Sequence, residues 1–139
     1  MTAALVPELD VSDLEASLAV YCGVLGFQIR YRRPEDRFAY LARDGAELML
    51  EEAAGPGRRF RTAPLDAPFG RGVNLQIRVA DAEDLLRRAR AAGLQIVLDL
   101  EERWYRRNSK EVGARQFVVA DPDGYLLRFS EDLGFRDRD

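Results

Sequence analysis

The chain has 139 residues, of which 47% are apolar and 32% charged, with a formal net charge of −3. This composition excludes a wholly disordered chain, and the lack of net positive charge argues against nucleic acid or an anionic membrane as a partner. Histidine is absent and Cys22 is the only cysteine, which excludes an internal disulfide and removes the commonest transition-metal ligand. We expect a cytoplasmic protein, because the chain shows no signal-peptide pattern and no apolar run of membrane-spanning length.

The first elements in chain order are a strand and a helix. Apolar and polar residues alternate over 4–11, which indicates a half-buried strand. Ser12 and Glu15 form a capping-box pattern, so a helix should begin there, and Gly26 should end it. Cys22 falls on the apolar face of this helix, where packing is its expected role.

Three strands should follow this helix and complete the first unit. They are expected at 27–33, 37–43 and 46–53, joined by the turns Arg33–Asp36 and Asp44–Gly45. A stretch rich in glycine and proline, 54–71, then forms a linker.

The second half predicts the same order of elements. Alternation from Val73 to Val79 indicates a strand, and Asp81 and Gly93 should begin and end a helix. The remaining strands are expected at 95–101, 113–120 and 124–131, with a tail at 132–139.

The two halves repeat each other, since Phe38–Gly45 aligns with Phe117–Gly124. A repeat of turn glycines and alternate apolar positions indicates one supersecondary unit used twice. We therefore expect a single α+β domain over 1–139, built from βαβββ units at 4–53 and 72–131. The second unit is longer than the first by the segment Leu100–Val112, which contains Trp104. We expect this extra segment to act in recognition.

Three features together resemble a known family. Val-x-Asp precedes each helix, Gly26-Phe27 follows the first helix, and Asp121-Pro122-Asp123-Gly124 precedes the last strand. Tandem units with these features resemble the vicinal-oxygen-chelate superfamily, which includes glyoxalase I, extradiol dioxygenases, fosfomycin-resistance enzymes and bleomycin-resistance proteins. The resemblance implies a curved mixed sheet with the helices on its convex side and a groove completed in a dimer.

In the members of that superfamily that use a metal, the ligands lie on the first and last strands of each unit. The matching positions here are Val6, Met49, Asn74 and Arg128. None of these side chains is a good ligand for a divalent metal, and Arg128 brings a fixed positive charge. We therefore expect no metal and no cofactor.

The remaining resemblance is to the metal-free bleomycin-resistance branch, whose members are dimers that sequester a drug between subunits. The chain shares Arg115 and Phe117 with that branch, ahead of the Asp-Pro-x-Gly turn. It differs at Gly113-Ala114, where that branch often has a Trp-Gly pair.

Strand alternation predicts which side chains line the groove. If Leu5, Leu9, Leu48, Leu50, Leu75, Ile77, Leu127 and Phe129 pack beneath the helices, their neighbours face the other way. The first unit then offers an acidic wall and the second a basic or amide wall. With aromatic residues of the linker and the extra segment added, the expected ligand-binding residues are Glu47, Met49, Glu51, Phe60, Asn74, Gln76, Trp104, Tyr105 and Arg128.

Three functions remain open from the sequence. The first is a metal-independent homodimer that sequesters an amphipathic, partly aromatic drug or metabolite. The second is a metal-free lyase or isomerase that uses Glu8, Glu47 or Glu51 as a base beside Arg128. The third is an interaction or structural module whose groove is filled by its own side chains, with Trp104 as the plug.

Overall fold

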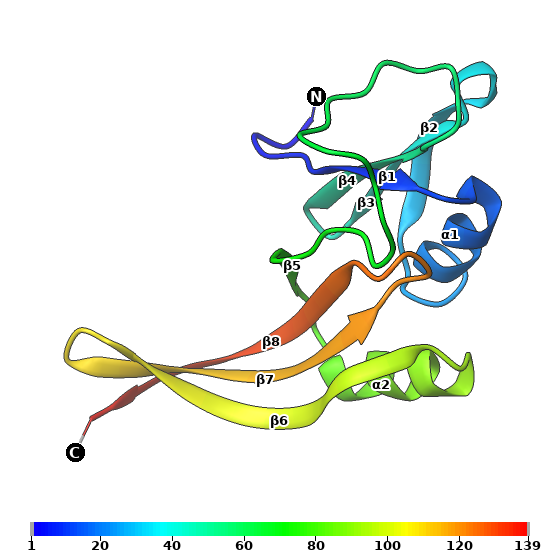
Figure 1. The fold of residues 1–139 in the computed structure, drawn as a ribbon. Helices are drawn as coiled ribbons and strands as arrows, with labels where there is room; N and C mark the ends of the chain where they lie inside the picture. Colours follow the sequence, from blue (N-terminus) through cyan, green and yellow to red (C-terminus); the bar gives the residue numbers. More distant parts are fainter. Residues whose placement is uncertain (1, 139) are drawn as a thin grey trace. The chain divides into compact units, whose positions relative to one another are not determined.

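The computed structural model describes residues 2–138. The chain divides into two compact units, Met1–Phe69 with Pro122–Gly124 and Gly70–Asp121 with Tyr125–Asp139. Each unit contains one four-stranded sheet and one α-helix in the order β-α-β-β-β (Figure 1). This is the predicted α+β class with tandem βαβββ units. No helix within residues 2–138 has the length and apolar character needed to cross a membrane.

The first unit is built on a mixed sheet. Its elements are β1 (Glu8–Val11), α1 (Leu14–Tyr21), β2 (Gln28–Arg33), the 3-10 helix η1 (Pro34–Asp36), β3 (Phe38–Arg43) and β4 (Ala46–Glu52). The strand order is β1-β4-β3-β2, in which β1 runs parallel to β4 and the other neighbours are antiparallel. The two hairpins predicted from the turn residues are present.

Helix α1 begins and ends differently from the prediction. Its N-cap is Asp13 rather than Ser12, and the Asp13 carboxylate accepts a hydrogen bond from the Ala16 amide at 3.1 Å. The helix ends at Tyr21, ahead of the expected stop at Gly26, which has a φ of +80°. A carboxylate at the N-cap also interacts favourably with the helix dipole, which explains why Asp13 takes this role.

The core of the first unit lies between α1 and its sheet. Leu9, Leu48 and Leu50 are buried there as predicted, whereas Leu5 is 81% exposed. Strand β1 starts only at Glu8, so the sheet does not impose its alternation on the residues before it. The apolar pattern of residues 4–7 was therefore a poor guide to burial.

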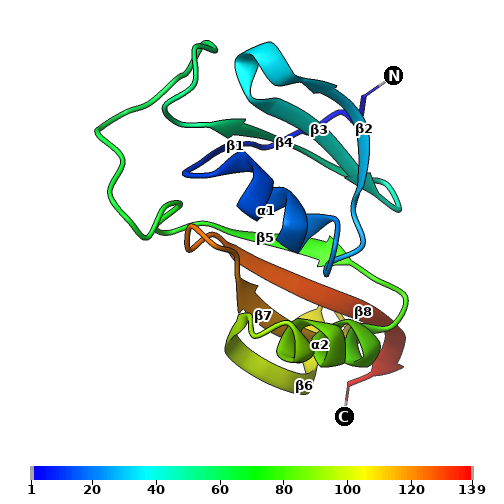
Figure 2. The ribbon, with the colours of Figure 1, turned by 90° about the vertical axis from the view of Figure 1, so that its right-hand side faces the viewer.

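The second unit repeats this arrangement with longer strands. Its elements are β5 (Asn74–Arg78), α2 (Ala82–Ala91), β6 (Gln95–Arg107), β7 (Lys110–Ala120) and β8 (Leu126–Asp137), with strand order β5-β8-β7-β6. Helix α2 packs on one face of this sheet (Figure 2). Asp81 caps α2 as predicted, because its carboxylate accepts a hydrogen bond from the Asp84 amide at 3.0 Å.

The extra segment of the second unit is a β-hairpin and not a loop. Strands β6 and β7 pair from Gln95 to the turn at Asn108, which has a φ of +57°. Strand β8 pairs alongside as far as Asp137, so the expected tail at 132–139 is largely strand. The three strands extend beyond α2 as a twisted ribbon (Figure 1). Asparagine tolerates a positive φ in tight turns, so Asn108 is the residue from which the hairpin could have been predicted.

The core of the second unit lies on the α2 side of its sheet. Ile77, Phe117, Leu127 and Phe129 are buried, and the rings of Phe117 and Phe129 stack with their centroids 5.5 Å apart. The alternate residues of these strands therefore lie on the face away from α2.

Candidate functional site

On the first unit, the sheet face away from α1 carries the predicted acidic residues, but an arginine from the linker covers them. The Arg59 guanidinium contacts Asp10 through Nε and Glu51 through Nη1, both at 2.6 Å. Arg61 also binds Asp10, at 3.1 Å. The side chains of Arg59 and Glu51 are only 9% and 7% exposed. The 54–71 segment thus supplies the charges that neutralise this part of the acidic wall.

Glu47 is also fully engaged within the first unit. The Tyr40 hydroxyl donates a hydrogen bond to its carboxylate at 2.5 Å, the Ala3 amide donates another, and Arg30 lies 3.2 Å away. The hydrogen bond from Tyr40, helped by the other two groups, lowers the pKa of Glu47. Burial, with the hydrogen bond to Glu47, raises the pKa of Tyr40 to about 12. Glu47 is therefore an ionised carboxylate that its three partners stabilise, and its lowered pKa makes it a poor general base.

Glu8 differs from Glu47 in the direction of its pKa shift. Desolvation, together with the nearby charge of Glu51, raises the pKa of Glu8 above its ordinary value. Glu8 lies opposite Met49 in the parallel pairing of β1 and β4. Compared with Glu47, Glu8 is thus the carboxylate whose surroundings shift its pKa toward neutral pH.

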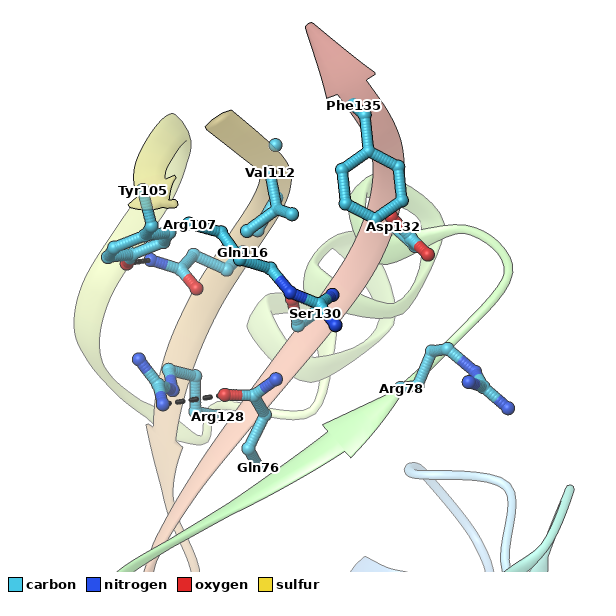
Figure 3. Close-up of a pocket in the computed structure, with 12 residues that line it drawn as sticks. Gln76, Arg78, Tyr105, Arg107, Val112, Gln116, Arg128, Ser130, Asp132 and Phe135 are labelled. Carbon is cyan, nitrogen blue, oxygen red and sulfur yellow. Dashed lines mark hydrogen bonds between the residues drawn. The ribbon is translucent and has the colours of Figure 1, made fainter. Parts of the chain in front are cut away.

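The second unit contains a cavity of about 480 Å³ on the sheet face away from α2 (Figure 3). Its lining combines arginines, amides and aromatic or small side chains from β5, β6, β7 and β8: Gln76, Arg78, Tyr105, Arg107, Val112, Gly113, Ala114, Gln116, Arg128, Ser130, Asp132 and Phe135. Three of the predicted ligand-binding residues, Gln76, Tyr105 and Arg128, therefore come together here.

Hydrogen bonds hold the polar side chains of the cavity in place. Arg128 Nη2 donates to Gln76 Oε1 at 2.6 Å, and these residues are direct neighbours in the parallel pairing of β5 and β8. Gln116, which is 3% exposed, donates to the Tyr105 hydroxyl at 2.5 Å and to the Glu101 carboxylate at 3.1 Å. The Tyr105 ring is thereby fixed as one wall of the cavity (Figure 3).

Trp104 does not line this cavity. It is adjacent to Tyr105 in β6, so the two side chains point to opposite faces of the sheet. The Trp104 ring covers Gly113, where an added Cβ would lie 2.7 Å from it, and the Arg136 guanidinium lies 4.1 Å from the ring centroid. Trp104 Nε1 donates to Glu102 at 3.1 Å. The absence of a side chain at Gly113 is what makes room for this ring.

The other predicted site residues lie outside the cavity. Met49, Glu47 and Glu51 belong to the first unit, and Asn74 is exposed at the start of β5. Phe60 is 77% exposed, and the Arg58 guanidinium lies 4.8 Å from the centroid of its ring in cation–π geometry. Phe60 therefore neither lines the cavity nor packs into the core.

The residues at the metal-ligand positions implied by the resemblance do not fit a divalent metal. Arg128 holds a permanent cation there, Asn74 offers a neutral amide, and Val6 and Met49 offer no hard donor. Over residues 2–138, no group of three or more cysteine, aspartate or glutamate side chains is placed to hold a metal ion.

Sequence reasoning missed several residues of the two sheet faces. Arg59 lies in a segment without periodicity, so nothing local indicated that it would reach Asp10. Gln116 was assigned no role, and Phe135 fell in the expected tail. Gln116 could have been found by alternation, because it precedes the buried Phe117 and must face away from α2.

Comparison with known proteins agrees with this architecture. The family model described as glyoxalase/bleomycin resistance protein/dioxygenase superfamily matches residues 6–129. Bleomycin resistance proteins from Geobacillus stearothermophilus and Staphylococcus aureus are each 28% identical over 137 residues, covering 92% of this chain and 96% of theirs. The crystal structure of TioX from Micromonospora sp. ML1 matches with a TM-score of 0.74 and 25% identity, covering 93% of this chain and 98% of TioX. The chain therefore belongs to the glyoxalase/bleomycin resistance protein/dioxygenase superfamily.

Proposed function

We propose that this chain is a metal-independent binding protein that sequesters an amphipathic, partly aromatic drug or metabolite without changing it. The observation that carries the proposal is the cavity of the second unit, whose volume of about 480 Å³ lies within the range of small-molecule sites, roughly 300–1,000 Å³. Its lining joins aromatic and apolar side chains to a few fixed polar groups, which is the composition of a binding site. The similarity to bleomycin resistance proteins supports the same function.

A metal-free lyase or isomerase remains the second candidate, and the raised pKa of Glu8 is the observation that favours it. The cavity itself argues for binding, because Asp132 is the only carboxylate among its lining residues and none of them is a cysteine or lysine nucleophile. Mass spectrometry of each bound compound after prolonged incubation separates the two functions. Unchanged compound supports sequestration, and a product that depends on Glu8 supports the enzyme.

The proposal predicts that Tyr105, and not Trp104, determines affinity for planar ligands. A panel of naphthalene, quinoline and indole compounds is first screened for those that bind the parent protein. For these compounds, Tyr105→Ala should reduce the affinity by about twofold to tenfold, because an aromatic contact contributes about 0.5–1.5 kcal/mol beyond burial. Trp104→Ala, on the opposite sheet face, should leave these affinities unchanged. Isothermal titration calorimetry on matched samples measures both.

Two results would contradict this assignment of the site. In the first, no compound of the panel binds at millimolar concentration. In the second, Trp104→Ala abolishes binding while Tyr105→Ala does not. The second result would place the ligand on the other face of β6.

We further propose that the protein is a homodimer with an isologous interface. Two small units bury limited apolar surface, and large side chains such as Ile29, Tyr31 and Val97 are left 41–50% exposed. Sedimentation velocity at micromolar concentration should give the mass of two chains. A monomer under these conditions would contradict the dimer without affecting the cavity.

A further inference from the structure

We propose that the ligand of the cavity carries a carboxylate beside its aromatic part, and that Arg128 binds this carboxylate. The proposal rests on the proposed binding function and defines its ligand more narrowly. Three independent features of the cavity support it: the balance of charge in the lining, the surroundings of the Arg128 guanidinium, and the position of the aromatic side chains.

The first feature is an excess of positive charge that the protein itself does not neutralise. Arg78, Arg107 and Arg128 line the cavity, and none of them forms an ion pair within residues 2–138. The single lining acid, Asp132, accepts a hydrogen bond from the Gly134 amide at 2.9 Å. Elsewhere in the same sheet an arginine pairs readily, as Arg115 does with Glu131 at 3.3 Å. An anionic ligand would balance this charge.

The second feature is a charged donor without an acceptor. Arg128 Nε is buried, and it has no hydrogen-bond partner among the described residues. A buried donor left unsatisfied is unfavourable, and more so on a charged group. Because Nε is buried, an acceptor atom of a ligand removes that penalty only if the Arg128 side chain turns toward the ligand, and the cost of this movement reduces the binding energy gained.

The geometry at Arg128 suits a carboxylate in particular. Gln76 uses its amide oxygen to accept from Arg128 Nη2, at 2.6 Å, so its amide nitrogen is left to donate. One charged donor with an adjacent neutral donor matches the two in-plane oxygens of a carboxylate. A phosphoryl group, with three oxygens and up to two charges, would leave more acceptors without partners.

The third feature is the separation of the charged and aromatic parts of the cavity. Figure 3 shows Arg128 and Gln76 side by side at one end, and Phe135 at the other; Arg78 lies apart from them. The Arg107 guanidinium lies 5.5 Å from the centroid of the Phe135 ring. With Tyr105 as a side wall, the cavity offers a surface for a planar ring next to an anion site.

The test compares two probes of the same shape and different charge, 2-naphthoate and 2-naphthamide, by isothermal titration calorimetry at neutral pH. The parent protein should bind the acid about tenfold or more tightly than the amide, as expected for a charge-assisted hydrogen bond. Arg128→Gln should remove this preference, chiefly by lowering the affinity for 2-naphthoate. Arg128→Lys, which keeps the charge without Nε, should restore only part of it.

Arg87→Gln is the matched control, because it removes the same charge from a side chain on α2 that is 72% exposed and pairs with Asp84. It should leave both affinities and their ratio unchanged. Thermal melting of each variant checks the fold. If Arg128→Gln does not fold, the ratio of the affinities for 2-naphthoate and 2-naphthamide still decides the question, measured in the parent protein and in Arg128→Lys.

The possible failures can be told apart. Equal binding of acid and amide by the parent protein, or a preference that survives in Arg128→Gln, overturns the carboxylate site and leaves sequestration standing. Tighter binding of 2-naphthyl phosphate than of 2-naphthoate, lost in Arg128→Gln, overturns the carboxylate in favour of a phosphate. If neither naphthalene probe binds, this inference fails, while the wider compound panel decides the proposed function separately.

Discussion

Replacing Arg59 with glutamine should lower the free energy of unfolding by about 3–5 kcal/mol, the effect expected when one partner of a buried ion pair is removed. Arg59 reaches Asp10 and Glu51 at 2.6 Å each and also donates to the Glu52 carbonyl. Its side chain is 9% exposed, so water cannot replace it easily. Without it, the Glu51 carboxylate would stay buried without its cation. Urea unfolding at neutral pH measures the loss.

Two further variants show whether the effect comes from the unpaired acid. Adding Glu51→Gln to Arg59→Gln should recover part of the lost stability, because the second change removes the unpaired negative charge. Arg58→Gln, beside it in the same segment, should change stability by less than about 0.5 kcal/mol, as surface substitutions do. A loss below about 1 kcal/mol for Arg59→Gln would mean that water or movement of the segment replaces the guanidinium.

Gly124→Ala should cost about 2–5 kcal/mol, and the equivalent change in the other repeat should cost less. Gly124 has a φ of +93°, and its repeat partner Gly45 has a φ of +91°. The strain of a side chain in this region is about 1–2 kcal/mol at either position. A Cβ at Gly124 would also lie 2.4 Å from Pro68 Cβ and 3.1 Å from its Cα, whereas nothing lies within 4 Å at Gly45. Overpacking adds about 1–3 kcal/mol at the first position only.

Thermal or urea unfolding of Gly124→Ala and Gly45→Ala, measured side by side, gives the part of the stability loss that comes from packing against Pro68. Because both glycines have nearly the same backbone conformation, the difference between the two losses measures the contact with Pro68. Equal losses would show that backbone strain alone makes glycine necessary at this turn. A larger loss at Gly45 would contradict the packing described for both turns.

The repeat and the order of elements could be predicted because they depend on local signals. Capping by Asp81, the turn at Asp44–Gly45 and the alternation around Ile77 each act over a few residues, and each recurs in the other half. The prediction of buried residues failed where the alternation of apolar and polar residues continued beyond the paired part of β1. Leu5 followed the alternation of β1 but lies before the first paired residues, and it is exposed.

The hairpin of β6 and β7 shows why the strands were expected to end at 101 and to begin again only at 113. Glu101–Arg107 contains many charged residues, and such a sequence resembles a loop when only polarity is considered. Pairing of β7 with both β6 and β8 makes it a central strand, which long-range hydrogen bonds decide and local composition does not. The same pairing sends Tyr105 and Trp104 to opposite faces, so only one of these neighbouring aromatics lines the cavity.

The sequence by itself determined the family, the two βαβββ units and the absence of suitable metal ligands at Val6, Met49, Asn74 and Arg128, because these follow from residue type and short spacing. Only the tertiary structure decided which charges remain available to a ligand. Arg59, from the irregular segment after β4, neutralises Asp10 and Glu51, while Arg128 keeps a buried Nε without a partner. The physical reason is that charge pairing depends on distance in space, and residues some 50 positions apart become neighbours only when the chain folds.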